Sequence, residues 1–204
     1  MRTVTGKRTA VAGTARAVMA GAVFGYVEVF TKGIDRLPEK PCGGAVDRGL
    51  AADALPSARK AEERGKLTSP DDLFFSCYVR TDDSIVSGEV QAGRATEATW
   101  QEAHRSDRED GAVPVSAGEV KALALPTRAR VYVPCAPRRT EAGAKERRCL
   151  TVRARTIGET RLHGTALRQV VAGFACQMAR HAYEAGECGE TIAFPGELPR
   201  LGSN

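Results

Sequence analysis

The stretch "RVYVPCAPRRTEAGAKERRCLTVRAR", residues 130–155, decides the fold, because it holds two alternating segments on either side of a polar loop. The alternation covers 130–133 and again 150–155, which is the period of a half-buried strand. Between them, Pro137, Gly143 and many charges interrupt any regular pattern. The stretch therefore predicts an antiparallel hairpin with a long loop.

Two cysteines bracket this loop, Cys135 at the end of the first strand and Cys149 at the start of the second. Such positions lie near one another across an antiparallel ladder, and we expect a Cys135–Cys149 disulfide. Closing a loop of about 15 residues would contribute on the order of 3 kcal/mol in the chain-entropy model.

The chain has six cysteines and no CxxC, which weighs against a zinc ribbon and against a thioredoxin-type redox pair. An even number at wide spacings favours disulfides formed in an oxidising compartment. Beside the first pair we expect Cys42–Cys77, between a leading helix and a strand, and Cys176–Cys188. The alternative is a cytosolic protein with six buried thiols.

Residues 1–30 have the order of an export signal or membrane anchor, positive charges first and then the uncharged run Ala17–Val27. That run of 11 residues spans about 16 Å as a helix, about half of the hydrocarbon thickness. A soluble amphipathic helix is the alternative. We expect the protein at the extracytoplasmic face of the cell membrane, or secreted, with residues 31–41 as a linker.

The remaining pattern predicts one α+β domain over residues 42–190 and an extended tail over 191–204. Ala45–Leu55 is expected to be a short helix, 56–72 a loop, and Leu73–Arg80 with Ser84–Gln91 a second hairpin. Thr165–Gly186 reads as a long amphipathic helix, begun by Thr165 and ended by Gly186. The expected fold is a mainly antiparallel sheet from two β-hairpins, packed on this long C-terminal helix and held by disulfides.

The net charge of +5 is concentrated in residues 128–168, where 11 Lys and Arg oppose three Glu. A segment with a net charge of +8 suits polyanions such as nucleic acid, anionic lipid or a phosphate-containing wall polymer. The hairpin loop supplies the expected anion-binding residues Arg138, Arg139, Arg147 and Arg148. The simpler interpretation is a solvated arginine face on a protein with 23 arginines.

A search for catalytic motifs finds no GxSxG, P-loop, GxGxxG or HExxH. The three histidines, His104, His163 and His181, lack metal-ligand spacing, and a metal held by Cys176, His181 and Cys188 is a weaker alternative. Trp100 is expected to anchor a core at the edge of the sheet rather than to stack on a ligand. The sequence therefore predicts no catalytic residue, cofactor or metal, and favours a binding protein over an enzyme.

Short motifs carry a resemblance: "PCGGAVDRGLAADALP", "FFSCYV", "VPVSAG", "ARVYVPC", "CLTVRAR" and "GECGE" after an apolar N-terminal segment. Over residues 42–190 the chain resembles uncharacterised membrane-anchored extracytoplasmic proteins of streptomycetes and related actinobacteria. The arginine-rich composition agrees with a GC-rich bacterial genome. The resemblance implies an envelope location and structural disulfides, and it implies no activity.

We therefore expect a non-catalytic cell-envelope domain that binds an anionic lipid, a wall polymer or a protein partner. The alternatives are a cytosolic nucleic-acid-binding accessory protein that uses the basic 128–168 segment, and an enzyme whose site lacks a recognisable motif.

Overall fold

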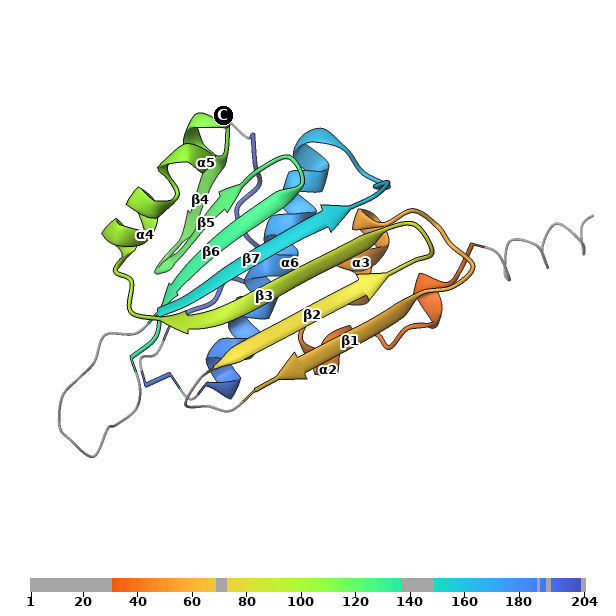
Figure 1. The fold of residues 1–204 in the computed structure, drawn as a ribbon, viewed down its shortest axis with the longest axis horizontal. Helices are drawn as coiled ribbons and strands as arrows, with labels where there is room; N and C mark the ends of the chain where they lie inside the picture. The colour runs from red at the N-terminus through yellow and green to blue at the C-terminus, as the bar shows by residue number, and fades with distance from the viewer. Residues whose placement is uncertain (1–30, 69–72, 137–148, 187, 190–191, 203–204) are drawn as a thin grey trace, which may run out of the picture.

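Seven strands pair in a single antiparallel sheet in the order β1-β2-β3-β7-β6-β5-β4 (Figure 1). The structure is a computed structural model, which describes residues 31–68, 73–136, 149–186, 188–189 and 192–202. The strands are β1 (Glu62–Leu67), β2 (Phe74–Arg80), β3 (Ile85–Gly93), β4 (Val113–Ala117), β5 (Val120–Ala124), β6 (Arg128–Pro134) and β7 (Cys149–Ile157). The helices are the 3-10 helix η1 (Ile34–Arg36), α2 (Pro41–Gly44), α3 (Arg48–Ala54), α4 (Glu97–Ala103), α5 (Arg105–Glu109) and α6 (Gly164–Ala185).

The sheet consists of two meanders, β1 to β3 and β4 to β7, joined where β3 pairs with β7. Buried and accessible side chains alternate along most of β2, β3 and β7, as in the buried Phe75, Cys77 and Val79 of β2. The buried set faces α6, α2 and α3, which lie behind the sheet in Figure 1. This confirms the predicted α+β fold, its mainly antiparallel sheet, both hairpins, the C-terminal helix and the presence of disulfides.

Helix α6 supplies the centre of the core through the predicted apolar stripe. Leu167, Val170, Val171, Phe174 and Met178 are all buried. The helix ends at Gly186 as expected, whereas its N-cap is His163 rather than Thr165. The predicted boundaries were therefore right to within one or two residues.

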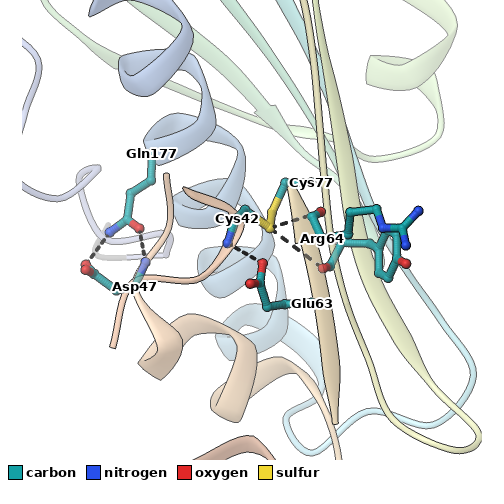
Figure 2. Close-up of a disulfide and its surroundings, with 7 residues drawn as sticks. Cys42, Asp47, Glu63, Arg64, Cys77 and Gln177 are labelled. Carbon is teal, nitrogen blue, oxygen red and sulfur yellow. Dashed lines mark hydrogen bonds between the residues drawn. A yellow bond between two sulfur atoms is a disulfide. The ribbon is translucent and has the colours of Figure 1, made fainter. Parts of the chain in front are cut away.

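The first meander is fastened to the helical layer by a disulfide between Cys42 of α2 and Cys77 of β2 (Figure 2). The predicted Cys42–Cys77 pair is thus confirmed. Gly65 of β1 passes so close beneath α2 that a Cβ there would lie 2.6 Å from the Cys42 carbonyl oxygen. On the other side, Asp47 and Gln177 of α6 form two hydrogen bonds, of 2.6 and 2.7 Å. The segment from α2 to α3 therefore bridges the sheet and α6.

The predicted Cys135–Cys149 disulfide is wrong, and so is Cys176–Cys188. The structure joins Cys135 to Cys188, and the thiols of Cys149 and Cys176 are free and buried. The register places Cys149 opposite Pro134, one residue from Cys135. Because side chains alternate between the faces of a strand, this single-residue offset puts the two cysteines on opposite faces of the sheet.

The segment 56–72, predicted as a loop, contains the edge strand β1. Helices α4 and α5 were not predicted from the sequence, whereas Trp100 of α4 is buried as expected. The tail, predicted to lie extended over the surface, packs along α6 in its described residues: Leu198 is buried, and Phe194 packs edge-on against Tyr183 at 5.2 Å.

None of the helices in the described ranges combines the length and the apolar character that a membrane crossing requires. The expected signal or anchor, residues 1–30, lies outside those ranges.

Candidate anion-binding face

The candidate site lies on the face of the sheet opposite α6. Alternation along β6 and β7 places four arginines there, Arg128, Arg130, Arg153 and Arg155, which we call the arginine face. Their intervening residues, Ala129 and Ala154, are buried on the α6 side. The arginine face lines a depression of about 560 Å³ together with residues of β2 and β3. The further lining residues are Ser76, Cys77 and Tyr78 of β2, Ile85, Ser87, Gly88 and Glu89 of β3, and Ala154 of β7.

The strand register sets like charges directly opposite one another. Arg128 is the cross-strand partner of Arg155, and Arg130 is the partner of Arg153. Directly opposed residues on one face have Cβ atoms about 4.5–5.5 Å apart, and like charges at such positions destabilise the sheet. In the described sheet these two adjacent pairs are the only directly opposed residues of like charge.

Each arginine pair continues across the sheet as a row of polar side chains. The register runs from Arg155 to Ser87 of β3, Tyr78 of β2 and Arg64 of β1. The second row runs from Arg153 through Glu89 and Ser76 to Lys66 in the same way. The depression is therefore lined by guanidinium groups on one side and by hydroxyls and one carboxylate on the other.

Only one of the four arginines forms an ion pair with another described residue. Arg130 Nε donates to Asp107 Oδ2 at 3.4 Å, and its side chain is 19% exposed. Arg128, Arg153 and Arg155 are exposed and form no ion pair with any other described side chain. Three guanidinium groups thus remain able to bind an anion, beside one that is held in position.

The group that holds Arg130 comes from the α4–α5 corner. Asp107 is buried, and its Oδ2 lies 3.0 Å from His104 Nδ1. Helix α4 starts with a capping box between Thr96 and Thr99, which fixes the orientation of the helix. Trp100 anchors it in a second small core with Tyr132, Leu123, Leu125, Ala112 and Cys149. The corner therefore holds Asp107 within hydrogen-bonding distance of Arg130.

The pKa of His104 lies below its ordinary value. Burial is the main cause, and the charges of Arg130 and Arg153 act in the same direction, against the opposing effect of Asp107. The lowered pKa favours the neutral imidazole at neutral pH, so that the positive charge of this region comes mainly from the arginines.

The two free thiols do not belong to this site. Burial raises the pKa of Cys149, although backbone hydrogen bonds oppose the shift, and burial raises that of Cys176 against the charge of Arg180. Thiols with raised pKa values are poor nucleophiles at neutral pH. Within the described part of the chain, no cluster of His, Cys, Asp and Glu is suited to hold a metal ion. The alternative ligand set also fails because Cys188 is in a disulfide.

The predicted anion-binding residues of the loop are not those of the arginine face. Arg138, Arg139, Arg147 and Arg148 fall in residues 137–148, outside the described ranges. The arginine face lies in the basic 128–168 segment but was not singled out in advance. A signal for it exists in the sequence: Arg-Ala-Arg occurs at 128–130 and again at 153–155, within segments that alternate. Paired in antiparallel register, these triplets set all four arginines on one face.

No family model matches the chain, and comparisons with curated proteins and with solved structures gave no match either.

Proposed function

We propose that the protein is a non-catalytic domain of the cell envelope that binds a phosphate-bearing anionic ligand at the arginine face. The observation that carries this proposal is the two pairs of directly opposed arginines on β6 and β7. Three of these four arginines have no ion pair with a described residue. A bound anion would relieve the repulsion between them. Guanidinium forks suit phosphate because they donate two parallel hydrogen bonds.

The envelope location is supported by the two disulfides, which persist in oxidising compartments. The signal-like residues 1–30 and the resemblance to membrane-anchored actinobacterial proteins point the same way. Disulfides also weigh against the alternative of a cytosolic nucleic-acid-binding protein. We expect four of the six thiols of the protein isolated from its host to be alkylated only after reduction. Alkylation of all six in the denatured, unreduced protein would overturn the envelope location.

Binding is tested by titrating the full chain with a fluorescent long-chain inorganic polyphosphate and measuring anisotropy. A variant with Arg128, Arg130, Arg153 and Arg155 all changed to Gln should bind at least about tenfold more weakly. The matched comparison changes Arg138, Arg139, Arg147 and Arg148 to Gln, which removes the same charge from the loop. If the loop variant loses binding and the arginine-face variant keeps it, the proposed site is wrong. If neither variant loses binding, anion recognition by this hairpin is refuted.

A further inference from the structure

The spacing of the arginine pairs indicates what kind of ligand the site accepts. Arg128 with Arg155 forms one pair, and Arg130 with Arg153 forms the other. The pairs are two residues apart along their strands, which is about 6.7 Å at the rise of an antiparallel strand. Each pair can direct two guanidinium groups at one phosphate. The arginine face therefore presents two anion positions in line along β6 and β7.

We propose that these positions bind two successive phosphates of a phosphodiester-linked polyol chain that runs along β6 and β7, one phosphate at each arginine pair. The inference rests on the proposed function. Successive phosphates joined through a short polyol such as glycerol are separated by three carbon atoms and two ester oxygens. When such a bridge is extended, the distance between its two phosphates is comparable with the spacing of the two arginine pairs along β6 and β7.

The side chains beside the arginines suit the polyol part of such a chain. Glu89 is the cross-strand partner of Arg153, and Ser87 is the partner of Arg155. A carboxylate accepts hydrogen bonds from hydroxyl groups, whereas it repels a third phosphate. Tyr78 and Ser76 extend this polar wall one strand further. The depression thus offers anion positions on β6 and β7 and hydroxyl acceptors on β2 and β3.

The same face is poorly suited to a nucleic acid, which has the same number of carbon atoms between its phosphates. Proteins that bind single strands combine positive charge with exposed aromatic rings on which bases stack. Here Trp100 and Tyr132 are only 3% and 6% exposed, and their rings pack against each other at 5.7 Å. Among the residues that line the depression, Tyr78 is the one aromatic side chain, and it is half-buried. Recognition of the backbone, without base stacking, is what this surface offers.

The test is calorimetric titration of the full chain with glycerol phosphate oligomers that carry one, two or four phosphates. The second phosphate should raise affinity at least about tenfold, because it binds as a tethered group. Arg128→Gln and Arg153→Gln each break one pair, and in each variant the gain from the second phosphate should disappear. The control Lys60→Gln removes one exposed charge outside the arginine face and should keep the gain.

A thymidine oligonucleotide with equal phosphate number is the comparison ligand, and it should bind more weakly than the glycerol phosphate oligomer. Tighter binding of the oligonucleotide would overturn the polyol assignment. Equal affinity for one and two phosphates would overturn the two-position geometry, while phosphate binding itself would still support the proposed function. Absence of binding to every oligomer and to polyphosphate would refute both.

Discussion

Changing the charge of Arg155 tests whether repulsion between the opposed arginines lowers the stability of the protein. We expect Arg155→Gln to stabilise the unliganded protein slightly and Arg155→Glu to stabilise it further. The reason is that Arg128 lies directly opposite in the register, and no ion pair with a described residue offsets the contact. Where two directly opposed residues carry opposite charges, removing one charge would leave the free energy of unfolding unchanged or lower it.

The magnitude follows from the register. Two unit charges about 6 Å apart in water repel by about 0.7 kcal/mol. At an ionic strength of about 0.01 M, where the Debye length is about 30 Å, screening leaves about 0.6 kcal/mol of this repulsion. Arg155→Gln should therefore raise the free energy of unfolding by about 0.6 kcal/mol, and Arg155→Glu by about twice that amount. At 1 M salt, where the Debye length is about 3 Å, both gains should nearly vanish.

The assay is urea unfolding of the full chain at low and high sodium chloride, in a buffer without phosphate, because phosphate would occupy the proposed site. Lys60→Gln and Lys60→Glu repeat the same charge changes outside the arginine face, and should change stability by much less. If both Arg155 variants are destabilised, and to the same extent at both salt concentrations, Arg155 makes favourable contacts and the reasoning fails.

Three further predictions concern the scaffold. Replacing Cys42 and Cys77 together by Ala opens a loop of about 36 residues and should lower the free energy of unfolding by about 3.8 kcal/mol in the chain-entropy model. Urea unfolding measures this change, and an unchanged midpoint would contradict the pairing. Gly65→Ala should destabilise by roughly 1–3 kcal/mol, because its Cβ would lie 2.6 Å from backbone that the disulfide holds in place, whereas Gly49→Ala meets no atom within 4 Å and should not be destabilised. The pKa of His104 is lowered from 6.5 in the native state, so as pH falls through 6.5 the unfolded chain takes up a proton that the native chain does not, and stability falls. His104→Gln should lose less stability over this range, and a steeper loss would contradict the direction of the shift.

Much of the fold was predictable because its strands and its long helix show alternating and helical patterns of apolar residues. The hairpins and α6 carry strong patterns, since each buries one face against the same core. Strand β1 was missed for a physical reason: at the edge of the sheet, "EERGKL" exposes nearly every side chain and shows no apolar alternation. Backbone pairing with β2, rather than side-chain burial, makes it a strand.

The disulfides show where sequence reasoning reaches its limit. The hairpin was correctly predicted, yet a one-residue offset in register moved Cys149 to the face opposite Cys135. The residue-to-residue register was not available from the pattern alone. Cys135 instead meets Cys188, which follows α6 and comes close only in the folded chain. Long-range contacts of this kind depend on how α6 lies on the sheet.

The predicted anion-binding residues of the loop lie outside the described ranges, and the proposed site uses other arginines of the same basic segment. The excess of charge in 128–168 pointed to anion binding, and the loop arginines drew attention because they are adjacent in sequence. The triplets at 128–130 and 153–155 are far apart in sequence. Pairing of β6 with β7 brings them together in the folded chain. A site built across two strands becomes visible only when alternation and pairing are considered together.

Another cross-strand pair of charged residues in the same sheet can be compared with the arginine face. On the same face, β1 and β2 set Glu62 opposite Arg80, and the two side chains form an ion pair of 2.7 Å. Cross-strand pairs of opposite charge stabilise a sheet. The chain carries 25 acidic residues from which such partners could be drawn. On β6 and β7 it opposes arginine to arginine twice, and departures from a local rule of this kind are expected at functional sites. The proposed anion would supply the opposite charge that the arginines of β6 and β7 lack within the described residues.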